Sequence, residues 1–260
     1  WKSRGDLMLK TVRNAFKVED IRKRLLYTLL MLVVVRFGSQ LPTPGVDPTF
    51  IQNFFAQQTG DAFNFFDAFT GGSFTSMSLF ALGITPYITS SIIVQLLTIA
   101  IPKLEEMQKD GEDGRKKINE YTRYLSIALA VIEGAAIVIG FRNQGLFGTD
   151  NPQSSMTTAI VVAVAALTAG AAFMMWLGEQ ITEKGVGNGI SIILLINIVA
   201  RIPNDLSNLY QNYVAKPTDV TSKIIAAVII LAIIVAMFVF IVFLQDGERR
   251  IPVQYAKKIQ

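Results

Sequence analysis

Apolar residues gather along this chain in long runs that carry no charge, among them 25–35, 159–177 and 224–244. An α-helix needs about 20 predominantly apolar residues to cross the hydrocarbon core of a bilayer, and several of the runs reach that length. The pattern predicts six membrane-spanning helices, at residues 25–41, 76–101, 121–141, 156–176, 189–202 and 223–244. The fifth is short, so we expect it to extend beyond residue 202 or to cross a thin part of the bilayer.

Lysine and arginine are distributed unevenly between the connecting segments. Of the 24 such residues, 19 lie in the N-terminal segment, the second and fourth loops and the C-terminal tail. Because positive charge concentrates in cytoplasmic segments, both ends of the chain are expected in the cytoplasm. The net charge of +4 reflects this topology rather than a nucleic-acid surface.

The amino-acid composition excludes several kinds of catalysis and metal binding. Hydrophobic residues make up 51% of the chain, and it contains neither cysteine nor histidine. That excludes disulfides, thiol catalysis, histidine-ligated metals and Ser–His hydrolases. We therefore expect an all-α polytopic membrane protein that is not an enzyme and uses no cofactor or metal.

The second predicted span contains Gly83 and Pro86, which both weaken a helix. Pro86 has no N–H to bond the carbonyl of Leu82. Transmembrane helices tolerate such a break when hydroxyls, waters or neighbouring helices satisfy the freed groups.

One face of this span carries Ile84 and Ile88 and continues with Ser91 and Gln95. A face that is apolar at mid-membrane and polar beyond it suits a narrow constriction that opens into a wet vestibule. Ordinary packing between helices is the alternative explanation for the two isoleucines.

The aromatic segment 60–74 is too short and too acidic to span the membrane, and it contains the pair Gly71 and Gly72. It is either a re-entrant piece or an interfacial helix on the outer surface, and composition does not choose between them. The glycine pair supplies a flexible joint in both cases.

Five stretches together resemble the SecY family of bacterial protein-translocating channels. They are SLFALGITPYITSSIIVQLL, LEEMQKDGEDGRKKINEYTRY, RFGSQLPTPGVD, MWLGEQITEKGVGNGISI and RRIPVQYAKK. The resemblance runs from about Met8 to the last residue. It implies a channel of two pseudo-symmetric halves around an hourglass pore, with this chain supplying one half and the sixth span.

The resemblance implies that a ring of apolar side chains forms the waist of the pore and that a short plug closes its outer funnel. The matching ring residues here are Ile84, Ile88, Ile190 and Leu194. The segment at about 61–75 resembles the plug, which favours the re-entrant alternative. Its plug residues are Phe63, Phe65, Phe66, Phe69, Gly71 and Gly72.

Glu133 interrupts the third span, and an ionisable group inside a span is expensive unless it is paired. The resemblance assigns it, with Thr89, to a lateral gate that opens toward lipid. The alternative is a carboxylate that reaches the outer interface by itself. The family's third gate partner lies on a seventh span.

The family also implies partners and driving forces. These are the SecE and SecG subunits, the SecA motor or the ribosome, a preprotein with its signal sequence, membrane lipids and the remaining C-terminal SecY spans. The expected docking residues are Arg249, Arg250, Lys257 and Lys258. Arginine pairs bind carboxylates and phosphates equally well, so the sequence does not choose between motor and ribosome.

Asn188 is expected to cap the fifth span.

The expected organisation follows the family order. Residues 1–7 are expected to be an expression tag, 8–24 a cytoplasmic segment, 25–202 spans one to five, 203–244 an external loop with span six, and 245–260 the start of the next cytoplasmic loop. The family continues through four more spans, so the remainder is expected elsewhere, as part of a longer protein or a second chain. The expected location is the bacterial plasma membrane.

Two other classes of membrane protein fit these residues less well. A secondary transporter also uses broken helices, but it needs polar groups that converge at the waist, where this chain has isoleucine and leucine. An intramembrane hydrolase would need a histidine or paired carboxylates.

Overall fold

The computed structural model describes residues 18–47, 49, 54, 67–147, 156–211 and 220–247. Apart from an isolated antiparallel bridge between Pro42 and Ser78, these residues form only helices, turns and irregular segments. The helices are α2 (Glu19–Gly38), α5 (Thr85–Ala100), α6 (Pro102–Lys109), α7 (Glu112–Arg142), α8 (Met156–Lys184), α9 (Gly189–Leu209) and α10 (Val220–Gln245). The predicted all-α class is confirmed.

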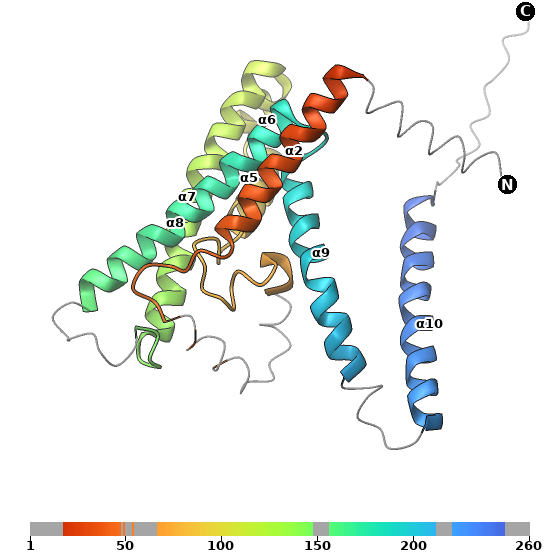
Figure 1. Ribbon diagram of the computed structural model, residues 1–260. Helices are drawn as coiled ribbons and strands as arrows, with labels where there is room; N and C mark the ends of the chain where they lie inside the picture. The colour runs from red at the N-terminus through yellow and green to blue at the C-terminus, as the bar shows by residue number, and fades with distance from the viewer. Residues whose placement is uncertain are drawn as a thin grey trace, which may run out of the picture. The chain divides into compact units, whose positions relative to one another are not determined.

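The chain divides into two units after Arg201, within α9. In the first unit α7 packs against both α8 and α5, and α2 packs against α8 (Figure 1). The second unit contains the end of α9 and the whole of α10. A window of α10 from Ala227 has a mean hydropathy of 3.5, which is typical of a helix in contact with lipid or with other apolar helices.

The first unit buries two apolar clusters. The α7–α8 cluster contains Val46, Phe74, Met77, Ala81, Leu82, Ala130, Val138, Leu146, Phe147, Ala163, Leu167 and Ala171. The central cluster contains Val35, Phe80, Ile84, Met174, Leu177, Ile181 and Ile193. The segment between residues 71 and 84 contributes to both, so it lies inside the unit and joins its two cores.

Helix α7 packs closely because its buried face is made mostly of small residues at four-residue spacing. This buried stripe is Gly114, Thr122, Ser126, Ala130, Gly134 and Val138. Residues four apart lie on the same face of a helix, so the stripe forms one continuous contact surface. The other faces expose apolar side chains such as Ile132 and Ile139, as expected for a helix that crosses a membrane.

The predicted helix at 76–101 is wrong over its first nine residues. Residues 71–84 form turns, and α5 begins only at Thr85, with Pro86 in its first turn. Proline is favoured there because the N–H that it lacks has no helical partner at that position. The chain before α5 passes through left-handed backbone at Met77 (φ 41°) and Gly83 (φ 58°), which a helix cannot contain.

The other predicted spans are helices whose ends differ from the apolar runs. Three of them continue into charged or polar residues: α2 starts at Glu19, α7 starts at Glu112, and α8 ends at Lys184. The predicted extension of the fifth span is confirmed, since α9 continues through Pro203 to Leu209. Hydropathy marks the part of a helix that lies in lipid, but the helix itself continues into water.

Four helices in the described part of the chain are long and apolar enough to cross a membrane: α7, α8, α9 and the Ala227–Gln245 part of α10. The pair α5 and α6 qualifies as one span with a 103° bend. Helix α2 is not among them, because its apolar run follows the charged first turns from Glu19 to Arg24.

Gly170 allows the buried turn segment to reach α8. A Cβ placed on this residue would lie 1.9 Å from the carbonyl oxygen of Leu79, which belongs to the backbone and cannot rotate away. By contrast, a Cβ on Gly140 of α7 would meet nothing within 4 Å.

We predict that Gly170→Ala lowers the thermal unfolding temperature of the detergent-solubilised full-length protein, because overpacking costs about 1–3 kcal/mol. Gly140→Ala is the matched control. It should be neutral or slightly stabilising, since alanine is favoured over glycine in a helix by roughly 0.5–1 kcal/mol. Equal unfolding temperatures for the two variants would contradict the close contact at Leu79.

Candidate functional site

The segment from Gly71 to Ile84 is non-helical and mostly buried. Ser73, Phe74, Met77 and Leu82 are all at most 3% exposed. Non-helical backbone at membrane depth is tolerated only where protein or a water-filled cavity surrounds it. The segment is therefore the feature of the first unit that requires a functional or structural explanation.

Hydrogen bonds to the loop after α2 satisfy part of this buried backbone. The Thr43 N–H donates to the carbonyl of Met77 at 2.9 Å, and the Leu79 N–H donates to the carbonyl of Leu41 at 2.8 Å. The bridge at Pro42 lies between them, so the two strands of chain pair as in a short sheet. This pairing attaches the C-terminal part of the segment to the end of α2.

Asp67 satisfies the N-terminal part of the segment. Its Oδ1 accepts the backbone N–H of Thr75 at 3.0 Å, and its Oδ2 accepts the Thr75 hydroxyl at 3.2 Å. The Thr70 hydroxyl donates to the Asp67 carbonyl at 3.1 Å and itself accepts the N–H of Phe74 at 3.2 Å. Residues 67–75 begin with one helical turn at 67–70 and thus fold as one compact turn around a single carboxylate.

Two arginines from different helices hold this turn. Arg201 of α9 forms an ion pair with Asp67 Oδ2. Arg36 of α2 donates from Nη1 to the carbonyl of Gly71 at 3.5 Å. Asn197 lies one helical turn before Arg201 and close to Gly71. A Cβ placed on Gly71 would be 3.0 Å from the Cβ of Asn197.

The predicted plug lies partly within these residues. Phe63, Phe65 and Phe66 fall outside the described part of the chain, and Phe69 is half-buried. Gly71 and Gly72 have φ of 67° and 86°, a left-handed backbone that glycine adopts without strain. From Asp67 onward the segment begins with one helical turn at residues 67–70 and contacts α2 and α9. The choice between a re-entrant plug and an interfacial helix stays a prediction.

Three of the four predicted ring residues meet in the central cluster. Ile84 is buried there, and Ile88 and Ile190 pack partly buried against it. Leu194 is half-buried and, among the described residues, is not a member of this cluster. The buried residues of α9 are Gly189, Ile193 and Asn197. Ile190 and Leu194 each follow one of these residues in the sequence, so they lie at the edge of the buried face.

The hydroxyls of α5 have two different environments. Ser90 donates to the carbonyl of Tyr87 at 2.8 Å and Thr98 to that of Gln95 at 2.7 Å, so both bond to their own helix. Ser91 and Gln95 instead line a polar pocket of about 270 Å³ between α5, α6 and α7. The predicted change from an apolar to a polar face along α5 is therefore present.

The predicted gate pair is not joined in this structure. Thr89 and Glu133 are half-buried on α5 and α7, which pack together, but the described residues show no hydrogen bond between them. The gate assignment stays a prediction.

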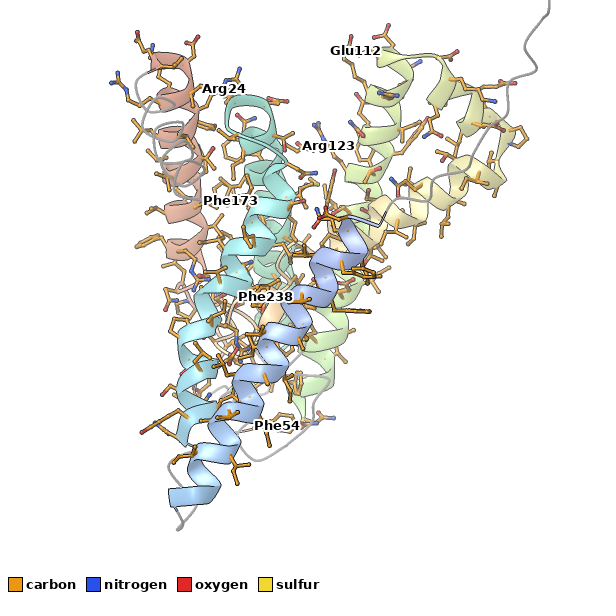
Figure 2. All side chains as sticks on the ribbon, turned by 90° about the vertical axis from the view of Figure 1, so that its right-hand side faces the viewer. Arg24, Phe54, Glu112, Arg123, Phe173 and Phe238 are labelled. Atoms are coloured by element: carbon orange, nitrogen blue, oxygen red, sulfur yellow. The ribbon has the colours of Figure 1, made fainter. Side chains whose placement is uncertain are left out.

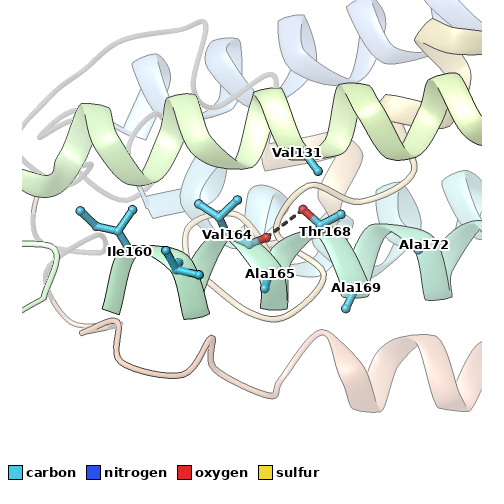
Figure 3. Close-up of a pocket in the computed structure, with 8 residues that line it drawn as sticks. Val131, Ile160, Val164, Ala165, Thr168, Ala169 and Ala172 are labelled. Carbon is cyan, nitrogen blue, oxygen red and sulfur yellow. Dashed lines mark hydrogen bonds between the residues drawn. The ribbon is translucent and has the colours of Figure 1, made fainter. Parts of the chain in front are cut away.

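An apolar groove of about 560 Å³ runs between α7 and α8 (Figure 3). Its lining includes Val131, Val164, Ala165 and Ala169, and its one hydroxyl, on Thr168, donates to the Val164 carbonyl at 2.8 Å. None of the described residues that line it is charged. A groove of this composition suits an acyl chain or an apolar helix better than a polar solute.

Several exposed or half-exposed charged side chains lie at one end of the bundle. Figure 2 shows Arg24, Glu112 and Arg123 at the end opposite to Phe54. Here Arg123 pairs with Glu179 at 2.7 Å, and Arg24 donates to the carbonyl of Gly185 at 3.3 Å. The predicted docking residues Arg249, Arg250, Lys257 and Lys258 lie outside the described residues.

The predicted cap at Asn188 is confirmed. Its Oδ1 accepts the N–H of Ile190 at 3.0 Å and that of Ser191 at 3.3 Å, at the first turn of α9. This is the usual way to satisfy the free N–H groups of a helix start.

Sequence reasoning missed Asp67, Arg201 and Arg36. Arg36 and Arg201 are among the five basic residues outside the four segments rich in lysine and arginine, and Asp67 is one of the acidic residues of segment 60–74. The available signal was their opposite charge on the same side of the membrane, since an ionisable group at membrane depth needs a partner.

Taken together, the helices and the buried turn segment define a polytopic helical membrane protein with a buried non-helical segment. The family model for SecY matches residues 78–260, and the chain belongs to the SecY family. It is 43% identical to the protein translocase subunit SecY of Halalkalibacterium halodurans over 97% of this chain and 58% of that relative. It is 41% identical to SecY of Bacillus subtilis over 96% of this chain and 57% of that one. The chain thus spans less than two thirds of the relatives' length.

The fold is also similar to a solved channel structure, Sec61 in the canine ribosome–channel complex from the endoplasmic reticulum. The TM-score is 0.58, with 20% identity over 89% of this chain and 49% of that one. At this identity the likeness concerns the fold alone.

Proposed function

We propose that this chain is the N-terminal part of the channel subunit of the bacterial protein-secretion translocon. The complete channel would pass unfolded preproteins across the plasma membrane and release hydrophobic segments sideways into lipid. The observation that carries the proposal is the buried turn segment 71–84, which enters a membrane bundle and leads directly into the apolar cluster around Ile84. Family membership supplies the class of activity.

The proposed mechanism is passive and involves no covalent chemistry. Isoleucine and leucine side chains at the waist offer no hydrogen bonds to a passing polypeptide, so they guide it without binding it. A hydrophobic signal sequence gains about 25 cal/mol for each Å² of apolar surface that it transfers from water into lipid. Energy comes from partners on the charged, cytoplasmic side, either SecA or the ribosome. SecE and SecG complete the assembly together with the remaining SecY spans.

The first prediction concerns the waist. Replacing Ile84, Ile88 and Ile190 together with serine in the complete channel should produce an ion leak at rest in planar bilayers. Water enters a constriction more readily when its lining can form hydrogen bonds, and ions follow. A channel that excludes ions as tightly as the parent would show that these side chains serve packing alone.

Ile193→Ser is the matched control for that experiment. Ile193 is fully buried in the same cluster, three residues after Ile190. This variant also destabilises the cluster, but it alters no proposed waist position. A leak of equal size in the control would assign the effect to lost packing.

The second prediction concerns the lateral gate. Glu133→Leu in the complete channel should change how hydrophobic a signal sequence must be for export, because a carboxylate near lipid alters the balance of open and closed gate. Export of a series of signal sequences with increasing leucine content measures this threshold. An unchanged threshold would favour a carboxylate that merely reaches the interface.

The third prediction concerns partner docking. Reversing Arg249 and Arg250 to glutamate should weaken binding of SecA or ribosomes to the full-length channel. The loss should shrink as salt rises, because exposed charges are screened within about 8 Å at physiological ionic strength. Unchanged binding at low salt would refute docking through these residues, while the resting ion conductance should stay at the parent level.

A further inference from the structure

Asp67 and Arg201 form the most deeply buried ion pair in the described part of the chain. Their side chains are 3% and 19% exposed, whereas the other ion pairs there involve side chains that are 20–93% exposed. The pair joins residues 134 positions apart, so it links a short turn to a distant helix. A charge in such surroundings is tolerated only when it is paired and hydrogen-bonded.

The Asp67 carboxylate has two separate tasks. Through Thr75 and Thr70 it folds residues 67–75 into a compact turn, and through Oδ2 it binds Arg201. Loss of Arg201 therefore leaves the internal hydrogen bonds of the turn intact but removes its ionic attachment to α9.

The remaining polar attachments divide at the middle of the segment. From Met77 onward, the backbone is paired with the loop at residues 41–43. Before Met77, the polar contacts that the described residues make with other elements are the ion pair and the 3.5 Å bond from Arg36 to Gly71, which is at the limit of hydrogen-bond geometry. The ion pair is thus the main polar attachment of residues 67–75.

One face of α9 carries both a residue of the central cluster and the arginine of the ion pair. Ile193, Asn197 and Arg201 follow one another at four-residue spacing, so one face of the helix continues from the central cluster to the ion pair. Among the residues that the structure describes, the buried Oδ1 of Asn197 has no hydrogen-bond partner, so Asn197 adds no hydrogen bond through this atom to the contact with the turn.

We propose that the Asp67–Arg201 pair is a latch that keeps residues 67–75 docked between α2 and α9, and that breaking this pair releases the turn. In the complete channel the released state would be the leaky one, a consequence that rests on the proposed function. The latch itself does not depend on it, so the two are tested by separate measurements.

Docking is measured by the protection of a cysteine at Ser73, which is 2% exposed. The full-length channel, with any other cysteines replaced, carries Ser73→Cys in lipid vesicles and is treated with a membrane-impermeant maleimide. Removing one member of a buried pair strands the other, so Arg201→Gln should raise the labelling rate by at least about ten-fold. Arg201→Lys keeps the charge and should retain most of the protection.

Glu179→Gln is the matched control, because it breaks the Arg123–Glu179 pair at the charged end of the same unit. It should leave Ser73→Cys labelling unchanged. Equal acceleration by Arg201→Lys and Arg201→Gln would overturn the latch, since labelling would then not follow the charge. Equal acceleration by Glu179→Gln would overturn it as well.

A double-mutant comparison tests whether the two residues act through one another. Asp67→Asn keeps an oxygen that can accept from Thr75, and its effect on labelling should not add to that of Arg201→Gln. Additive effects would overturn the latch. Ion conductance of the same variants then tests the channel role: faster labelling without a leak would support the latch but contradict the assignment of this turn to pore closure.

Discussion

The structure depends on one constraint: a buried stretch of non-helical backbone must have its polar groups satisfied without water. Residues 71–84 meet it by three means, which are tight internal turns, pairing with the loop after α2, and the carboxylate of Asp67. Each unsatisfied group at membrane depth would cost several kcal/mol. Small residues on the surrounding helices leave room for this segment. Gly170 of α8 leaves room for the Leu79 carbonyl, and the small-residue stripe of α7 brings that helix close enough to cover it.

This constraint also explains the composition of the second span. A chain that leaves a buried turn must start a new helix, and Pro86 in the first turn of α5 fits that start. The hydroxyls that follow are of two kinds. Some bond to their own backbone and allow a polar residue to lie in an apolar bundle, while Ser91 lines the polar pocket near the bend to α6. Polar residues in this apolar run thus either bond to their own helix or line a pocket.

Charge is arranged differently at the two ends of the bundle. At one end the pairs are exposed or half-exposed, as in Arg123 with Glu179, and exposed pairs contribute little to stability. At the other end, the charges of Arg36, Asp67 and Arg201 converge on one buried turn. A buried pair is expensive to break, so it can hold a segment in one of two positions. In the proposed channel, partners would bind at the end with exposed charges, and the closing element would contain the buried turn.

The sequence by itself determined the class, the order of the apolar segments, the cap at Asn188 and the family, because hydropathy, capping and motifs are local properties. It did not determine that residues 76–84 are turns, since an apolar run containing Pro86 reads equally well as a kinked helix or as a turn followed by a helix. Only the tertiary structure brought Asp67 together with Arg201, or Gly170 with Leu79. These contacts join segments about 90 to 134 residues apart, and nothing in the local pattern of either segment specifies its partner.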